Sequence, residues 1–180
     1  MAATGLEEKY DAVRQLIAVG KERGYLLYDE VNDSLPAEVH SSEEIDDLLT
    51  RYAAAVDTKD WNLYRTVFTD DAVIDYTSAG GIRGSLGEVV EWLSHAMKLF
   101  PMTQHFVTNR LVVLDGDTAT GRAYYYNPLG RPDGKGGTQL LFMGCYYDDR
   151  FSRTADGWRI AERVEETAWS QGSLPGAPEN

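Results

Sequence analysis

Apolar residues recur with a helical period in several segments of the first hundred residues. Over residues 6–23 they lie three or four positions apart, which predicts an amphipathic helix. Gly24 supplies a C-terminal stop for this helix. A second short helix is expected over residues 28–35, ended by Pro36.

The strongest amphipathic pattern begins near residue 41. Ser41 and Glu44 have the spacing of a capping box, and apolar residues then recur at helical intervals as far as Val56. Two further helices are expected, one capped by Asp60 and one over residues 86–100.

After Pro101 the hydrophobic period changes to two, which is typical of strands. Strands are expected over residues 72–76, 105–113, 119–126, 140–151 and 158–169, with a glycine- and proline-rich loop over 127–137. Helices followed by long antiparallel strands predict an α+β fold, with the helices on one face of a curved antiparallel sheet. We expect residues 1–40 to form a small acidic helical appendage, residues 41–170 the main domain and residues 171–180 a flexible tail.

Composition narrows the class of protein. The chain has 180 residues and a formal net charge of −12, which argues against nonspecific binding to nucleic acid or to an anionic membrane, since both need clustered cations. Cys145 is the single cysteine, so an intramolecular disulfide is excluded. No apolar run reaches the roughly 20 residues of a membrane helix, and the N-terminus lacks the features of a signal peptide. We therefore expect a cytoplasmic protein that binds neither nucleic acid nor membrane.

Few residues are candidates for chemistry. The three histidines, His40, His95 and His105, form no metal-binding motif with cysteines or carboxylates, and nucleotide-binding glycine motifs and a nucleophile elbow are absent. We therefore expect neither a metal nor an organic cofactor. Asp57, at the end of an apolar helix face, and His105, on an apolar strand face, remain as candidates for acid–base chemistry. Taken alone, each is better explained as structural, Asp57 as a solvated carboxylate and His105 as a core histidine.

Four segments of the chain carry a family resemblance. They are residues 51–61, 68–76, 103–106 and 156–160. Together they resemble the SnoaL-like and scytalone dehydratase branch of the nuclear-transport-factor-2-like superfamily, over residues 41–170. The resemblance implies a cone, in which a curved antiparallel sheet wraps around helices and leaves a deep pocket between them.

The resemblance also implies site residues. Asp57 takes the position of the pocket aspartate of scytalone dehydratase, His105 that of its first catalytic histidine, and Tyr76 that of a water-holding tyrosine. The chain departs from the family pattern at Val56, in place of a second tyrosine, and at Leu129, in place of a second histidine. These departures argue against scytalone itself as the substrate. An Asp57–His105 pair could still transfer a proton, because the aspartate would fix the tautomer of the ring and raise its basicity.

We expect the pocket to bind a hydrophobic, cyclic small molecule. Its predicted lining residues are Tyr52, Trp61, Tyr64, Trp92, Phe106, Tyr124, Tyr126, Phe142 and Trp169. The exposed face of the sheet is expected to form a homodimer through Tyr125, Tyr147 and Phe151, since cones of this family commonly pair there.

The N-terminal region has a second resemblance. Residues 16–36 and 44–49 are similar to the acidic N-terminal region of bacterial primary sigma factors, a helical module that keeps the DNA-binding domains of sigma off promoters. None of the later sigma regions follows. Three hypotheses therefore stay open: a cofactor-independent dehydratase, isomerase or cyclase; a non-catalytic ligand-binding cone; and an interaction module that contacts RNA polymerase through residues 1–40.

Overall fold

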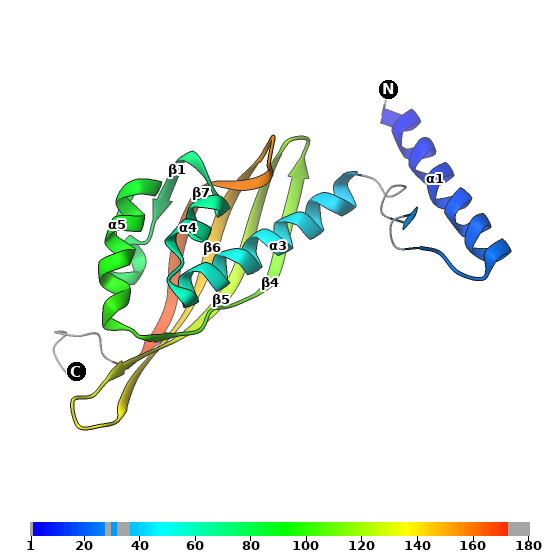
Figure 1. The fold of residues 1–180 in the computed structure, drawn as a ribbon. Helices are drawn as coiled ribbons and strands as arrows, with labels where there is room; N and C mark the ends of the chain where they lie inside the picture. Colours follow the sequence, from blue (N-terminus) through cyan, green and yellow to red (C-terminus); the bar gives the residue numbers. More distant parts are fainter. Residues whose placement is uncertain (1, 28–29, 32–36, 173–180) are drawn as a thin grey trace. The chain divides into compact units, whose positions relative to one another are not determined.

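The computed structural model describes residues 2–27, 30–31 and 37–172 (Figure 1). The chain divides into two compact units, Met1–Glu44 and Ile45–Asn180. In chain order, the helices and strands are α1 (Ala2–Arg23), α3 (Ala37–Thr58), α4 (Trp61–Val67), β1 (Phe68–Asp75), the 3₁₀ turn η1 (Thr77–Ala79), β2 (Arg83–Ser85), α5 (Leu86–Ala96), the 3₁₀ turn η2 (Met97–Leu99), β3 (Met102–Thr103), β4 (Phe106–Asp115), β5 (Thr118–Pro132), β6 (Thr138–Thr154) and β7 (Gly157–Gln171).

The first unit contains helix α1, which ends where the sequence predicts. Gly24 has a φ of 78°, and its backbone N–H donates to the carbonyl of Gly20 at 2.9 Å. Glycine thus supplies the left-handed residue that closes the helix. The predicted helix over residues 28–35 falls largely outside the described residues. The prediction that residues 1–40 form a domain of their own stays a prediction.

Helix α3 carries the apolar face that the sequence predicts. Its backbone is helical from Ala37, upstream of the predicted capping box, and the side chain of Ser41 lies outside the described part of the chain. In the second unit, six of its apolar residues are buried in the core: Ile45, Leu48, Leu49, Tyr52, Ala55 and Val56.

Side chains cap the two helices that follow. The Asp60 side chain accepts hydrogen bonds from the backbone N–H groups of Asn62 and Leu63 and so begins α4, as predicted. Ser85 and Glu88 form a complete capping box at the start of α5. The predicted helix over residues 86–100 is shorter than expected, because α5 ends at Ala96 and η2 follows it.

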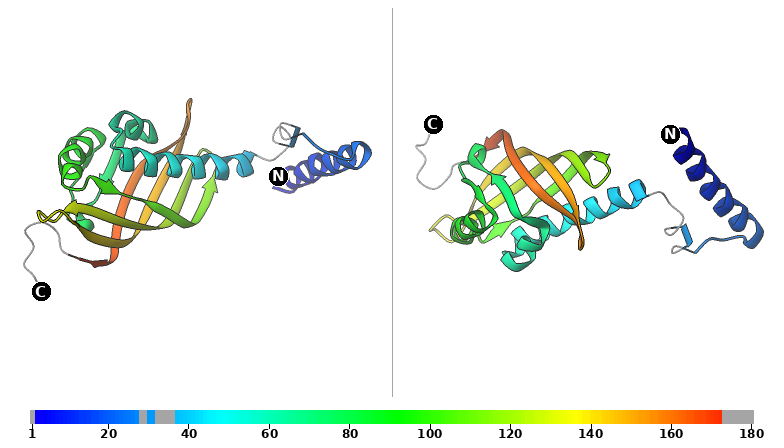
Figure 2. Two further views of the ribbon diagram at one scale, coloured as in Figure 1. Left: turned by 60° about the horizontal axis from the view of Figure 1, so that its bottom comes forward. Right: turned by 90° about the horizontal axis from the view of Figure 1, so that it is seen from above.

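A single mixed sheet curls around the helices of the second unit. Its strand order is β2–β1–β7–β6–β5–β3, and β4 also pairs with β5. The strands after residue 101 pair antiparallel, as predicted, whereas β1 runs parallel to β7. Helices α3, α4 and α5 lie on the concave face of the sheet (Figure 1), and two further views show the long strands curling past them (Figure 2). The predicted α+β cone is confirmed. The alternation of apolar and polar residues did not indicate the parallel pairing of β1 with β7.

Strand β5 extends beyond its predicted end. The loop predicted over residues 127–137 is wrong for residues 127–132, because each of them pairs with β6, from Asn127 opposite Met143 to Pro132 opposite Thr138. Pairing with a long neighbouring strand overrides the turn preference of prolines and glycines here. Because of this extension, Asn127 is part of strand β5 rather than of a loop.

A β-bulge changes which residues of β4 face inward. The pairing of β4 with β5 shifts register between Thr108 and Leu111, and Asn109 has a φ of 47°. Val107, before the bulge, packs against the core, but Leu111, after it, is 69% exposed. Simple alternation predicts that Leu111 shares the inner face with Val107 and His105. The extra residue of the bulge turns it outward instead.

The residues predicted to form the dimer surface are buried. Tyr125, Tyr147 and Phe151 all belong to the hydrophobic core, so they cannot meet a second copy of the chain. The two faces of the sheet are therefore exchanged relative to the prediction. No helix within the described residues is long and apolar enough to cross a membrane.

Candidate active site

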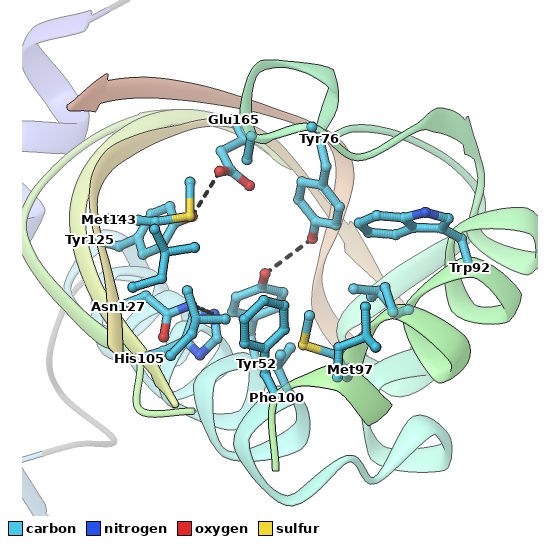
Figure 3. A pocket seen from close by; sticks show the side chains of 18 of the residues that line it. Tyr52, Tyr76, Trp92, Met97, Phe100, His105, Tyr125, Asn127, Met143 and Glu165 are labelled. Carbon is cyan, nitrogen blue, oxygen red and sulfur yellow. Dashed lines mark hydrogen bonds between the residues drawn. The ribbon is translucent and has the colours of Figure 1, made fainter. Parts of the chain in front are cut away.

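A cavity of about 570 Å³ lies in the second unit, between the inner face of the sheet and the helices (Figure 3). Its walls are largely apolar and include Val56, Leu93, Phe100, Leu129, Leu141 and Met143. Cavities of this size accommodate small organic ligands, and their few polar groups decide which ligand fits.

Asp57 holds His105 by two hydrogen bonds. Asp57 lies in the last turn of α3, and His105 lies immediately before β4. Asp57 Oδ1 lies 2.7 Å from Nδ1 of the ring, and Asp57 Oδ2 accepts the backbone N–H of His105 at 2.8 Å. The His105 side chain is only 5% exposed. The two contacts fix both the position and the orientation of the imidazole.

The same contacts set the charge of Asp57. Burial alone raises the pKa of its carboxyl group, but the hydrogen bonds from the ring and backbone of His105 outweigh burial and hold the pKa below its usual value. The carboxylate is therefore ionised at neutral pH and accepts Nδ1–H. Nε2 then carries a lone pair, and Asn127 Nδ2 donates to it at 3.1 Å. Asn127 Oδ1 is buried and has no hydrogen-bond partner among the described residues.

A row of tyrosine hydroxyls lies beside this pair. Tyr76 Oη lies 2.9 Å from Tyr64 Oη and 3.1 Å from Tyr52 Oη, which in turn lies 3.0 Å from Tyr147 Oη. Figure 3 shows the contact between Tyr52 and Tyr76. Burial raises the pKa of Tyr76 well above its usual value, so its hydroxyl stays neutral. Tyr76, predicted to orient a water, lines the cavity as a member of this row.

A buried ion pair supports two of these tyrosines. Arg163 is fully buried and donates two hydrogen bonds to Asp149, at 2.7 and 2.6 Å. Its guanidinium carbon lies 4.0 Å from the ring centre of Tyr52 and 3.9 Å from that of Tyr147, within cation–π range. Burial alone lowers the pKa of Arg163, but Asp149 outweighs burial and raises it. Arg163 thus keeps its charge between the two rings.

Glu165 enters the cavity from β7. Its Oε1 accepts the Tyr125 hydroxyl at 2.7 Å. The Tyr125 ring stacks on that of Tyr147, with centres 4.3 Å apart, and its centre lies 5.8 Å from that of His105. Tyr125 therefore contacts both the Asp57–His105 pair and Glu165.

The predicted lining residues divide into three groups. Tyr52 and Trp92 line the cavity as predicted. Trp61 and Tyr64 pack in the core behind it. The prediction is wrong for the other five, which gather on the outer face of the sheet and contact one another or solvent there: Phe106, Tyr124, Tyr126, Phe142 and Trp169.

The sequence of β5 contains a pattern that indicates which of its tyrosines faces the inside of the sheet. Arg122 shares its parity with Tyr124 and Tyr126, whereas Ala123 shares that of Tyr125. Because arginine is mostly exposed and alanine is often buried, this pattern points Tyr125 inward. The lining residues that sequence reasoning missed include Met97, Phe100, Tyr125, Asn127, Leu141, Met143, Tyr147 and Glu165.

The donor set of the cavity suits an organic ligand. Within the described residues, no three histidine, cysteine, aspartate or glutamate side chains come close enough to hold a metal ion. The polar side chains that line the cavity carry two imidazoles, from His95 and His105, one indole, one amide, several phenol hydroxyls and one carboxyl group, and such groups hydrogen-bond to the oxygen atoms of a ligand.

Known proteins share this arrangement of elements. The family described as SnoaL-like domain matches residues 37–164. The chain belongs to the SnoaL-like family. A relative, uncharacterized protein Rv2910c of Mycobacterium tuberculosis, is 43% identical over 129 residues, which cover 72% of this chain and 86% of the relative.

Solved structures agree with the SnoaL-like fold. The Kfla4162 protein from Kribbella flavida is 29% identical, with a TM-score of 0.68, and the match covers 76% of this chain and 95% of that one. Hexachlorocyclohexane dehydrochlorinase LinA-type3 from Novosphingobium barchaimii LL02 is 17% identical, with a TM-score of 0.64, over 78% of this chain and 94% of that one. The second likeness shows a common fold.

The N-terminal part of the SnoaL-like chain matches a second family. Sigma-70 factor region 1.1 matches residues 7–53, and RNA polymerase sigma factor RpoD of Neisseria gonorrhoeae is 44% identical over 45 residues. That match covers 25% of this chain but only 7% of the sigma factor. Both resemblances predicted from the sequence are therefore confirmed, and the two matches overlap over residues 37–53, on helix α3.

Proposed function

We propose that the cavity is the active site of a cofactor-independent dehydratase, isomerase or cyclase that acts on a hydrophobic cyclic substrate. The observation that carries this proposal is the two-point contact of Asp57 with His105, which leaves Nε2 of a cavity-lining imidazole available as a base. The apolar walls favour a substrate with few charges.

In the proposed reaction, Nε2 of His105 replaces its contact with Asn127 by a contact with substrate and takes a proton. Asp57 stabilises the imidazolium that forms, because it already accepts Nδ1–H. In a dehydration, the electron pair of the broken C–H bond forms the double bond, the C–O bond breaks, and His105 returns the proton to the leaving hydroxyl, giving water. In an isomerisation, the proton returns to another carbon. Tyr76 would hold the leaving oxygen by a hydrogen bond.

A ligand-binding cone without catalysis is the alternative, since a fold does not determine a reaction. The two functions differ in what the Asp57–His105 contact is for. To separate the two functions, Asp57 and His105 are each replaced, and turnover, ligand binding and melting temperature are measured on the same samples. Loss of turnover alone supports an enzyme. Loss of stability together with loss of ligand binding supports a non-catalytic binding protein.

We infer a second, independent role for residues 1–40 as a contact for RNA polymerase, supported by the similarity to RpoD. The full chain is expected to co-purify with bacterial core RNA polymerase, whereas residues 41–180 alone are not.

The shortened chain should keep its melting temperature within a few degrees, because among the side chains that the structure describes the buried core begins at Ile45. Equal polymerase binding by both chains would contradict the role, and insolubility of the shortened chain would contradict the separate appendage.

We also propose that two copies of the chain pair through the outer face of the sheet. The surface involved is the outer aromatic patch, defined as Phe106, Tyr124, Tyr126, Phe142 and Trp169. Trp169 packs over Gly144, where a Cβ atom would collide with the indole, and it is 50% exposed. Exposed apolar patches of this kind mark interaction sites, and aromatic residues are enriched in interface cores.

The pairing has a direct test. Light scattering at micromolar concentration should give the mass of a dimer for the wild-type chain and of a monomer for Tyr126→Glu, because the new charge would be buried at the interface. Asn62→Glu, which adds the same charge on the exposed surface of α4, should stay dimeric. A monomeric wild-type chain would refute the proposal.

A further inference from the structure

Glu165 is a carboxylic acid inside an apolar cavity, and the proposed reaction does not use it. Only 6% of the residue is exposed, and it lines the cavity from β7. Figure 3 shows its carboxyl group directed into the cavity, on a different wall from His105. A buried carboxyl group in this position is costly unless it is neutral or has a charged partner.

The groups around Glu165 supply hydrogen bonds but no direct counter-charge. From β5, the Tyr125 hydroxyl donates to Oε1 at 2.7 Å; from β6, the Cys145 thiol and the Tyr147 phenol face it. From α3, the Tyr52 phenol lies close enough that a charge on Glu165 would raise the pKa of the phenol. Tyr76 borders the same part of the cavity.

The cation that acts on Glu165 is Arg163, on the same strand, and both of its hydrogen bonds go to Asp149. Burial raises the pKa of Glu165 to about 7, against the smaller opposing effects of Tyr125, Cys145 and Arg163. A neutral carboxyl group carries one O–H donor. The Tyr125 hydroxyl already donates to Oε1, so that O–H belongs on Oε2; besides Tyr125, the Cys145 thiol is the other protein group that hydrogen-bonds to this carboxyl group.

We propose that Glu165, held by Tyr125, is a carbonyl-binding subsite, in which the protonated carboxyl group donates a hydrogen bond to the oxygen of an uncharged cyclic ketone. This inference rests on the proposed function, because it names the substrate class of the same cavity. A ligand carboxylate is excluded at this wall whenever Glu165 is ionised, since the two like charges would share an apolar site. A ketone oxygen accepts without bringing a charge and matches the donor.

The test uses the full-length chain and two probes, 1-indanone and indane, which differ in that a carbonyl group in the first replaces a CH₂ group in the second. Binding is measured by ligand-observed NMR between pH 5.5 and 8.5. The affinity for the ketone is expected to be highest below pH 7 and to fall roughly 3- to 10-fold above it. This loss corresponds to the contribution of one hydrogen bond. Indane should bind equally at all pH values. The same pH dependence for both probes would overturn the proposal.

Two variants assign the effect to Glu165. Glu165→Gln keeps a donor that does not titrate, so ketone binding should become independent of pH while remaining close to the wild-type value at pH 6. Tyr125→Phe removes a hydrogen bond that stabilises the ionised carboxylate, so the midpoint of the pH dependence should move upward. A wild-type midpoint in either folded variant would overturn the proposal, and Tyr125→Phe keeps the test decisive if Glu165→Gln fails to fold.

The outcome is distinguishable from that of the proposed function. Probe binding requires no turnover, so His105→Ala should keep the pH-dependent preference for the ketone even though it lacks the base. If Asp57 and His105 prove to be non-catalytic, the ketone preference stands unchanged. If the ketone preference fails, the effects of Asp57 and His105 substitutions on turnover are untouched.

Discussion

Asp57→Asn should lower turnover by about 10²–10⁴-fold, the usual contribution of a positioned acid–base group, with little effect on the fold. An asparagine presents an NH₂ group to one of the two N–H donors of His105, so at least one of the contacts at 2.7 and 2.8 Å is lost. The ring then lacks both its fixed tautomer and the negative charge that stabilises imidazolium. Proton abstraction can be followed by NMR as deuterium exchange into carbon-bound positions of a panel of hydrophobic cyclic compounds in D₂O.

His105→Ala should cause a loss of the same size, and the double variant should be little worse than either single one, because residues that act as a unit are non-additive. Asp46→Asn is the matched control, since it is the same substitution on the same helix and its carboxylate pairs with Arg110 away from the cavity. The control should keep wild-type exchange. Undiminished exchange in the Asp57 and His105 variants would remove them from the mechanism.

Asp149→Ala should lower the free energy of unfolding by about 3–5 kcal/mol, the range for removing one partner of a buried ion pair. Arg163 is fully buried and its Nη1 already lacks a partner among the described residues, so its charge would be left uncompensated. Urea denaturation measures the loss. Tyr52 and Tyr147 pack on the guanidinium, so the cavity should become less ordered as well.

The neighbouring residue offers the control for this prediction. Asp148 is paired with Arg122, but the two side chains are 43% and 41% exposed, and a pair of that kind contributes less than about 1 kcal/mol. Asp148→Ala should therefore have a small effect. Replacing both Asp149 and Arg163 by apolar residues should restore part of the lost stability, because the uncompensated charge is then removed. Equal effects of Asp148→Ala and Asp149→Ala would contradict the assigned role of the buried pair.

The Asp57–His105 contact was accessible from the sequence because of where the two residues lie in their elements. Asp57 closes the longest apolar helix face and His105 precedes the first long strand, so a helix packed on the sheet brings them together. The family resemblance pointed to the same two positions. Local signals also predicted the Asp60 cap of α4 and the antiparallel pairing of the strands after residue 101, but they missed the start of α3 at Ala37, the end of α5 at Ala96 and the parallel pairing of β1 with β7.

The face of each strand residue was much harder to predict. Both parities of β5 carry tyrosines, so apolar alternation alone leaves its direction undecided. Bulges then change the parity within a strand, at Asn109 in β4 and where the register of β7 shifts between Ile160 and Glu162. Glu165 was missed for a further reason: a glutamate in a strand is ordinarily solvated, and its burial depends on Tyr125, which lies two strands away.

The row of tyrosine hydroxyls has a consequence for what the cavity can recognise. Four phenols carry four protons, and the contacts joining Tyr64, Tyr76, Tyr52 and Tyr147 use three of them. One proton is always left over, and it moves along the row whenever a neighbouring contact reverses its direction. Tyr64 does not reach the cavity, so a ligand oxygen draws the spare proton to whichever of the other three phenols it meets. Rigid rings can therefore serve ligands with differently placed oxygens while no heavy atom moves.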